Sequence, residues 1–438
     1  MKLYKASLTI IGAMMLALGL GGTAMAFHDG GVAYCDGCHT MHNSSKGVKM
    51  TVNSPGANVA NAYLLQGSDQ SSTCLKCHNT SGATPSSYHI NTYPAPGAGS
   101  APTQLTPGGD FAWLQKSYSW TTPRAGSSAG ERHGHNIIAA DYNYVADATL
   151  TVAPGGSYPN TSLGCNSCHD PHSSARIVDA AGTIGHRTPG SAVLPISGSG
   201  SYGAMPTATE AVGVYRLLGG IGYQPDSVVG SFAFTADSPI AVAPATYNRS
   251  ESATDTRVAY GSGMSEWCSN CHTNMHNDSV DTNLRHPASN AAKLPVDILT
   301  NYNTYVKSGD LSGSNATAYT SMVPYEEGTA DRAALTAHAV IDGSVKIGPD
   351  ANSNVMCLSC HRAHASAWDS MSRWNNSSEF LTVAGNWPGT DAPTTEGQNG
   401  TYSSGKTMAE YQQAMYGRPA TLYATFQRSL CNKCHAKD

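Results

Sequence analysis

Residues 35–42 read CDGCHTMH, and the first five of them, Cys35-Asp-Gly-Cys38-His39, form a complete CxxCH motif. CxxCH is the attachment signal of a c-type haem. Its two cysteines form thioethers with the edge of the porphyrin, and its histidine ligates the iron from one face. A second histidine, His42, follows three positions after His39. The role of His42 decides how the whole protein is built.

Every cysteine of the chain belongs to the same kind of motif. The twelve cysteines form six CxxC pairs, and a histidine directly follows each pair. A disulfide framework, zinc knuckles or redox dithiols would also use paired cysteines, but none of these explains the six histidines. The sequence therefore predicts six covalently attached haem c groups, held by Cys35, Cys38 and His39; Cys74, Cys77 and His78; Cys165, Cys168 and His169; Cys268, Cys271 and His272; Cys357, Cys360 and His361; and Cys431, Cys434 and His435.

The first 26 residues have the pattern of a secretory signal peptide. Lys2 and Lys5 precede a short apolar run, which ends at a small-residue cleavage signal, Ala24-Met-Ala26. An uncleaved anchor helix is the alternative, but the apolar run is shorter than a bilayer span. No later segment has 18 consecutive apolar residues. We expect an exported protein without a membrane span, which crosses the periplasm and resides at the outer cell surface or outside the cell.

The composition predicts an unusual fold. Charged residues make up only 13% of the chain, which contains 45 Gly, 22 Tyr and only 6 Phe. Such a chain cannot easily offset its ordering entropy by burying side chains alone, so the porphyrins should form most of the core. We expect a multihaem c-type cytochrome: one domain over residues 27–438, mostly irregular coil with short helices and few strands wrapped around a continuous haem stack. The candidate helices are 292–307, 326–340 and 407–416, and the candidate strands are Tyr142–Val145 and Ile240–Val242.

A repeat of three haem-pair units organises the histidines. Each unit carries one histidine, then a CxxCHxxH motif, then a later CxxCH motif, and the units span about 27–125, 126–295 and 296–438. Removing the six motif histidines from the total of seventeen leaves eleven for six distal positions. We predict that two histidines from each unit fill these positions and give every iron two histidine ligands: His28, His42, His135, His172, His338 and His364.

Some of these distal assignments stay open. His28 lies two residues after the expected cleavage point, where chains fray, so His89, His286 or His276 could replace it or another distal ligand. His133 and His186 lie outside the repeat, and we expect both to be exposed to solvent. The sequence alone does not decide which distal histidine binds which iron.

Geometry indicates what the second histidine of each CxxCHxxH motif does. The thioethers fix His39 to one face of its own porphyrin, and His42, one helical turn further, lies on the same side of that ring. His42 should therefore bind a different iron, and the same reasoning applies to His172 and His364. Each CxxCHxxH turn would tie two haems together, which favours a chain of closely packed haems.

The pattern favours electron transfer over catalysis. A catalytic haem keeps an open iron position or a weak, exchangeable ligand, whereas here the histidines suffice to close all six positions. The chain shows no Ser-His-Asp, paired-carboxylate or phosphate-loop motif, so we predict no enzyme. The formal charge of -5, together with two propionates on each haem, makes nucleic acid an unsuitable partner. A monomeric periplasmic or surface electron carrier, with His42 turned inward, and a multihaem reductase with one open iron remain as alternatives.

Several longer segments resemble the filament-forming hexahaem outer-surface cytochromes of metal-reducing bacteria: FHDGGVAYCDGCHTMHNS, TPGGDFAW, GHNIIAADYNYVAD, GMSEWC, CLSCHRAHAS and CNKCHAKD. The resemblance runs from Phe27 to Asp438. It implies bis-histidine haems in a continuous stack, polymerisation into conductive filaments, and partners that include other cytochromes and external acceptors such as Fe(III) oxides. It also implies that His42 ligates the fifth haem, at His361, of a neighbouring subunit.

Overall fold

The computed structural model of the chain describes the following residues: 35–40, 44–45, 48–49, 63–80, 88–172, 175–186, 194, 196–225, 228, 232–244, 250–251, 254–276 and 286–435. The signal peptide expected at residues 1–26 lies outside them. Two of the expected distal ligands, His28 and His42, also lie outside them.

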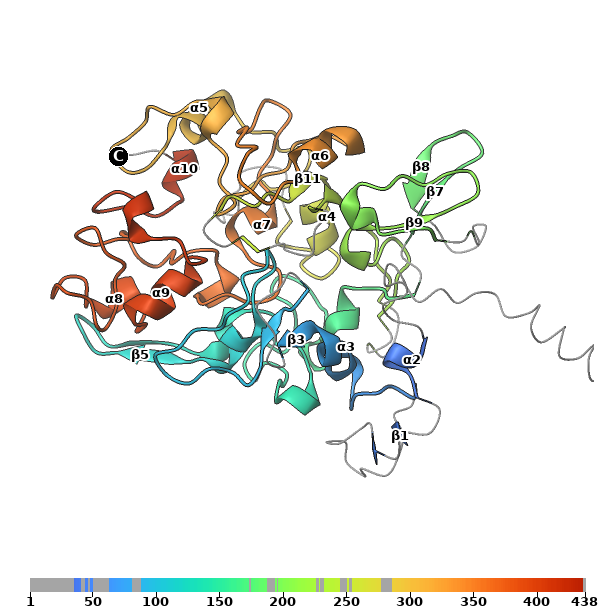
Figure 1. Cartoon of the computed structure of the whole chain (residues 1–438), viewed down its shortest axis with the longest axis horizontal. Helices are drawn as coiled ribbons and strands as arrows, with labels where there is room; N and C mark the ends of the chain where they lie inside the picture. The colour runs from blue at the N-terminus through green and yellow to red at the C-terminus, as the bar shows by residue number, and fades with distance from the viewer. Residues whose placement is uncertain are drawn as a thin grey trace, which may run out of the picture.

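Irregular backbone dominates the described residues, and the α-helices are short (Figure 1). They are α2 Cys35–Cys38, α3 Gln70–His78, α4 Met264–Cys268, α5 Val296–Thr304, α6 Arg332–His338, α7 Cys357–Cys360, α8 Gly400–Ser403, α9 Met408–Ala414 and α10 Asn432–His435. Helices α5, α6 and α9 lie inside the three ranges predicted from the sequence, which confirms those predictions. Short 3-10 turns connect the rest: η2 Phe111–Gln115, η3 Gly130–His133, η4 Ala140–Tyr142, η5 Asn160–Ser162, η6 Cys165–Ser167, η7 Gly200–Tyr202, η8 Tyr215–Leu217, η9 Asn315–Thr317, η10 Asp369–Met371 and η11 Ala420–Leu422.

The strands form small pairs rather than one central sheet. Antiparallel pairs join β1 Ser44–Ser45 to β2 Val48–Lys49, β5 Tyr118–Trp120 to β6 Gly126–Ser128, and β10 Ile240–Val242 to β11 Ala259–Ser262. β3 Asn79–Thr80 and β4 Asn91–Thr92 run parallel, and β7 Ala175–Val178 lies between β8 Ile184–His186 and β9 Val212–Gly213. The strand predicted at Ile240–Val242 is confirmed.

The strand predicted at Tyr142–Val145 is wrong. Tyr142 ends the 3-10 turn η4, and Asn143 follows with a left-handed backbone at φ 62. The chain reverses there, so that Tyr144 forms a bridge to Ala139. Asn adopts the left-handed region more readily than most residues, which is why the alternation of side chains around it does not produce a strand.

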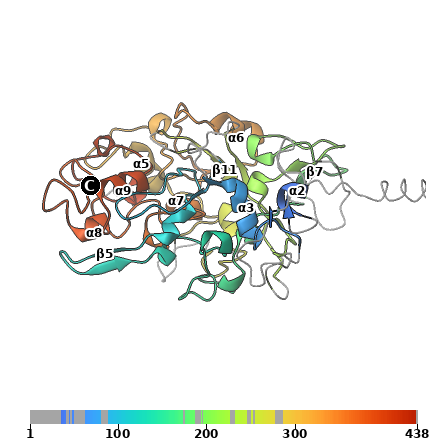
Figure 2. The same ribbon diagram turned by 60° about the horizontal axis from the view of Figure 1, so that its bottom comes forward.

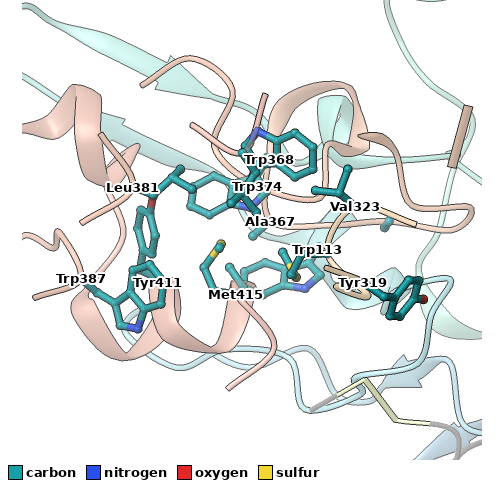
Figure 3. Close-up of a cluster of buried hydrophobic side chains, with 14 of the residues drawn as sticks. Trp113, Tyr319, Val323, Ala367, Trp368, Trp374, Leu381, Trp387, Tyr411 and Met415 are labelled. Carbon is teal, nitrogen blue, oxygen red and sulfur yellow. The ribbon is translucent and has the colours of Figure 1, made fainter. Parts of the chain in front are cut away.

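The buried side chains form several separate clusters, and the three largest border cysteines of the CxxCH motifs. The largest cluster contains Trp113, Trp368, Trp374, Trp387 and Tyr411, with Cys360 and Cys434 packed against it (Figure 3). A second cluster lies against Cys268, and a third against Cys165. The apolar side chains thus surround the haem attachment points instead of filling one continuous core, which is what a porphyrin-centred fold requires.

Contacts between distant segments hold this irregular chain together. Helix α3 packs on η6, and α4 packs on α7, so that attachment motifs meet directly. The C-terminal helices α8 and α9 lie beside the β5 hairpin in both views, and α10 packs on α5 (Figures 1 and 2). Motifs that are far apart in the sequence are therefore neighbours in the fold.

Candidate haem sites

Each CxxCH motif is shaped as one helical turn. In five of the six motifs, the histidine amide donates a hydrogen bond to the carbonyl of the first cysteine, four residues earlier: His39 (2.8 Å), His169 (3.0 Å), His272 (3.0 Å), His361 (3.1 Å) and His435 (3.0 Å). The remaining histidine, His78, ends helix α3. None of the twelve cysteines forms a disulfide. We refer to the six motifs as sites 1 to 6 in chain order, with proximal histidines His39, His78, His169, His272, His361 and His435.

The proximal imidazoles present one nitrogen and anchor the other. At five sites, Nδ1 lies within hydrogen-bond distance of a backbone carbonyl: His39 with Tyr63 (2.8 Å), His78 with Tyr88 (2.7 Å), His169 with Arg216 (2.7 Å), His272 with Pro154 (2.8 Å) and His361 with Ser370 (2.8 Å). A carbonyl accepts only, so Nδ1 carries the hydrogen and Nε2 is the unprotonated nitrogen, the form in which imidazole binds a metal. Metal-ligating histidines are held in this way, because the bond fixes the ring and raises its basicity.

Four proximal rings each face a second imidazole at the spacing of two ligands on one metal. Because a metal–imidazole bond is about 2 Å long and the ring centre lies about 1 Å behind its nitrogen, two such rings have centroids about 6 Å apart. The observed centroid separations are His39–His172 6.3 Å, His272–His135 6.1 Å, His169–His364 6.4 Å and His435–His286 6.0 Å. The two residues of each pair are far apart in sequence, so the tertiary fold sets the distance between their rings.

Two of these facing histidines are strongly desolvated. Burial, followed by the nearby His169 and His135, lowers the pKa of His364 to about 3. Burial and the nearby His272 lower the pKa of His135 to about 4, and its Nδ1 is 2.8 Å from the Ala363 carbonyl. Both imidazoles are therefore neutral at physiological pH, which is the form that binds a metal.

The structure thus brings His135, His172 and His364 opposite proximal rings, but not His338. His338 ends α6, and its Nδ1 lies 2.8 Å from the Glu327 carboxylate, which also pairs with Arg257 at 2.7 Å. Opposite His435 the structure places His286, which the sequence offered only as a reserve. Spacing along the chain could not find this, because His286 belongs to the second unit and meets the last site only through the tertiary fold.

The other reserve histidines are placed as follows. His276 lies 3.4 Å from Glu266. His89 is buried, with its ring 4.1 Å from that of Tyr88, whose carbonyl holds His78. His133 was expected to be exposed, and this is wrong: it is 0% exposed, because its two nitrogens lie 3.0 Å from the Trp113 carbonyl and 2.7 Å from the Ser128 hydroxyl. With both nitrogens occupied, His133 cannot ligate a metal in this position.

Site 5 differs from the four paired sites. Among the residues that the structure describes, no second imidazole ring faces His361, although His272 and His286 lie near enough to lower its pKa after burial. His42 and His28, the two expected ligands still unassigned, lie outside the described residues.

The six sites follow one another in sequence order. The Cys165 side chain raises the pKa of Cys74, and the Cys357 side chain raises that of Cys268, so the two cysteines of each pair are close neighbours. Burial is the main cause that raises the pKa values of Cys38, Cys168 and Cys360. The next cause in each case is a cysteine of the following site: Cys77 for Cys38, Cys271 for Cys168, and Cys431 and Cys434 for Cys360. Each cysteine pair therefore meets the next one along the chain, from site 1 to site 6.

The residues present fit haem c better than the alternatives considered from the cysteine pattern. Within the described part of the chain, no three His, Cys, Asp or Glu side chains converge as a metal-ion site. Buried N–H groups of basic side chains also lack hydrogen-bond partners there: Arg176 Nε and Nη1 and Arg332 Nε, on side chains no more than 6% exposed. Unsatisfied buried N–H groups are costly, and haem propionates would be suitable acceptors for them.

One arrangement has the residue types of a catalytic triad but not its geometry. Ser128 Oγ lies 2.7 Å from His133 Nε2 and donates to Asp369 at 2.5 Å, while His133 Nδ1 faces the Trp113 carbonyl. In a working triad the acid orients the base through Nδ1, and the serine is accessible to substrate. Here the acid binds the serine, and Ser128 is only 4% exposed. These residues form a structural hydrogen-bond network.

Comparisons with known proteins agree with this geometry. The chain is 55% identical to the C-type cytochrome OmcS of Geobacter sulfurreducens over 448 aligned positions, which cover 100% of both proteins. It also matches solved filament structures from that organism. The cryo-EM structure of OmcS nanowires has a TM-score of 0.85 at 54% identity, and the Outer Membrane Cytochrome S filament has a TM-score of 0.84 at 55% identity. Each match covers 94% of this chain and 100% of the other.

No family model matches the chain. Within the described residues, none of the helices has the length and hydropathy needed to cross a bilayer. The full-length identity, the six CxxCH turns and the facing imidazoles together establish that the chain belongs to the OmcS family of c-type cytochromes.

Proposed function

We propose that this protein is a hexahaem electron-transfer cytochrome that polymerises through His42 and carries electrons to acceptors outside the cell, such as Fe(III) oxides. The haem irons, when bound, supply the redox chemistry. The polypeptide attaches them, closes their axial positions and sets their order. Other cytochromes would deliver the electrons, and residues 1–26 would direct export through the periplasm.

The observation that carries this proposal is a regular register among the CxxCHxxH motifs. His172 belongs to the motif of site 3 and faces the proximal His39 of site 1. His364 belongs to the motif of site 5 and faces the proximal His169 of site 3. The second histidine of each motif thus serves the site two places earlier.

Continuing this register assigns His42. His42 belongs to the motif of site 1, and its own chain has no site two places before site 1. Among the odd-numbered sites, which this register serves, site 5 is the one whose proximal histidine, His361, faces no second imidazole among the described residues. If a neighbouring subunit preceded this one and the sites were counted on from it, its site 5 would lie two places before site 1. A bond between His42 and the iron of that site 5 would then join the two subunits and continue the order of haems from one chain into the next.

A second register assigns the even-numbered sites. His135 precedes the motif of site 3 and faces the proximal histidine of site 4, and His286 precedes the motif of site 5 and faces that of site 6. By the same rule His28, which precedes the motif of site 1, would ligate site 2, with His89 as its rival. All six irons would then have two histidines, which leaves no open position for substrate and favours electron transfer alone.

In this proposal His42 binds an iron of the neighbouring subunit, whereas in a monomeric carrier it would bind an iron of its own chain. Cryo-electron microscopy of the purified native protein tests this directly. Filaments with a regular subunit repeat and His42 bound to the neighbour's site 5 are the expected result, with six haems per chain by pyridine haemochrome assay. Discrete particles at high concentration would favour the monomeric carrier, and a high-spin iron in the resting protein with rapid cyanide binding would favour the reductase.

A further inference from the structure

One backbone arrangement recurs around the proximal histidines of the odd-numbered sites. The carbonyls that face Nδ1 of His39, His169 and His361 belong to Tyr63, Arg216 and Ser370. The residue that follows each carbonyl has a left-handed backbone: Leu64 at φ 56, Leu217 at φ 53 and Met371 at φ 46. None of these three is a glycine.

Two further hydrogen bonds repeat around each histidine. The amide that follows the histidine donates to the carbonyl of the left-handed residue: Thr40 to Leu64 (2.6 Å), Asp170 to Leu217 (2.7 Å) and Arg362 to Met371 (2.8 Å). The amide two residues after the left-handed residue donates to the carbonyl of the second cysteine: Gln66 to Cys38 (2.8 Å), Gly219 to Cys168 (2.9 Å) and Arg373 to Cys360 (2.8 Å). We call the three segments, 63–66, 216–219 and 370–373, the left-handed clamps.

The residue types show that the clamps hold a strained conformation. A left-handed backbone is unfavourable for an L-residue with a side chain and persists only where the surroundings determine it. At site 4 the residue in the equivalent position is a glycine. There Pro154 offers its carbonyl to His272, and Gly155 follows at φ 67, a conformation that glycine adopts freely. In the clamps at sites 3 and 5 the acceptor residues are left-handed as well, Arg216 at φ 51 and Ser370 at φ 56.

We propose that Leu64, Leu217 and Met371 are positioning residues that act through their backbone. The left-handed turn aims the preceding carbonyl at the proximal imidazole, keeps the hydrogen on Nδ1 and turns Nε2 toward the iron. This inference rests on the haem ligation proposed above. A hydrogen bond from Nδ1 raises the basicity of a ligating imidazole and favours ferric iron, so each clamp lowers the reduction potential of its own haem.

Two substitutions at Leu217 distinguish an effect of its backbone conformation from an effect of its side chain. Leu217→Ile keeps the same atoms but adds a β-branch, which opposes a left-handed backbone. Leu217→Gly removes the side chain but adopts that backbone freely. The readouts are a potentiometric titration of the complete hexahaem protein and its low-spin electron paramagnetic resonance spectrum. We expect Leu217→Ile to raise the potential of one of the six haems and to shift its low-spin signal, and Leu217→Gly to leave both unchanged.

Ala384 provides the matched control, because it is left-handed at φ 51 in an exposed turn outside the clamps. Ala384→Ile should lower the unfolding midpoint and leave all six potentials unchanged. Wild-type potentials in Leu217→Ile, or an equal shift in Leu217→Gly, would overturn the proposal. If Leu217→Ile does not accumulate with six haems, Leu64→Ile repeats the test at site 1, where Leu64 is 36% exposed. A high-spin iron in the wild-type protein would instead contradict the ligation proposal, so the two failures are distinguishable.

Discussion

The imidazole of His172 lies 6.3 Å from that of His39, with the two rings inclined by 22°, although the residues belong to the third and first haem motifs. This separation is that of two ligands on one metal, and a single iron bound by both would link two units of the repeat. The turn that holds one haem by its proximal histidine would therefore also supply the second ligand of the haem two places earlier. Haem packing and chain folding would then be coupled, as ligand binding and folding are at other metal sites.

Replacing His42 tests the connection between subunits. His42→Ala should abolish filaments while all six haems stay attached, because no cysteine or proximal histidine changes. One iron per chain, that of site 5, should become high-spin. Electron microscopy and electron paramagnetic resonance measure the two effects. His338→Ala is the matched control and should assemble normally, and a His42→Ala variant that forms wild-type filaments would refute the interface.

The choice between His286 and His338 for site 6 can be decided with two variants. His286→Ala should convert one haem in six to a high-spin form, because it removes the ring that faces His435 at 6.0 Å. His338→Ala should leave every haem low-spin, because its imidazole is bound to Glu327 at 2.8 Å. Electron paramagnetic resonance of the resting proteins distinguishes them. The reverse result would restore His338 to the set of distal ligands first expected from the sequence.

The buried carboxylate of Glu251 should contribute strongly to stability. Glu251 lies 2.6 Å from Arg362 and 3.4 Å from Arg373, and none of the three side chains is more than 4% exposed. Glu251→Gln leaves two buried guanidinium groups without a counter-charge, which should cost about 3–5 kcal/mol of unfolding free energy. Denaturant unfolding measures this loss.

The exposed pair of Glu379 and Arg428 is the control for that experiment. Its side chains are 57% and 43% exposed, and the nitrogen–oxygen distance is 2.8 Å. Glu379→Gln should change the unfolding free energy by no more than about 1 kcal/mol, since solvent screens the pair. Equal losses in the two variants would mean that burial does not govern the effect.

Glu326 should make stability depend on pH. Burial raises its pKa from 4.5 to about 7, although hydrogen bonds from the Asn354 side chain and the Met264 amide act to lower it. The folded state thus holds the proton more tightly than the unfolded state. Its contribution is fully present below pH 4.5 and is lost as the pH rises through 7, by about 3 kcal/mol at 1.36 kcal/mol per pKa unit.

Glu326→Gln should remove this dependence. The difference in unfolding free energy between the wild type and the variant is the quantity to measure, at several pH values from 4 to 8. We expect the difference to shift in favour of the variant as the pH rises. A difference that stays constant over this range would show that Glu326 has an ordinary pKa in the folded protein.

Some features of the fold could be predicted from local sequence because local physics controls them. The CxxCH turns depend on residues four apart, and the helices at α5, α6 and α9 depend on nearby side chains. The choice of His286 over His338 opposite His435 could not be predicted, because it depends on a tertiary contact between residues of two different units. The left-handed clamps were also hidden, because Leu64, Leu217 and Met371 carry no sign of an unusual backbone.

If His42 binds site 5 of the next subunit, as proposed, the two-site register of the CxxCHxxH motifs would make the two ends of an assembly chemically different. A subunit at one end would hold an iron at site 5 that lacks its sixth ligand, and a subunit at the other end would carry an unused His42. Such a head-to-tail contact cannot close on itself as a two-fold dimer does, so growth would have a direction. Added imidazole or cyanide would bind only at the first kind of end. The ligand bound per haem would then report the mean number of subunits per filament, and an excess of ligand would stop elongation from that end alone.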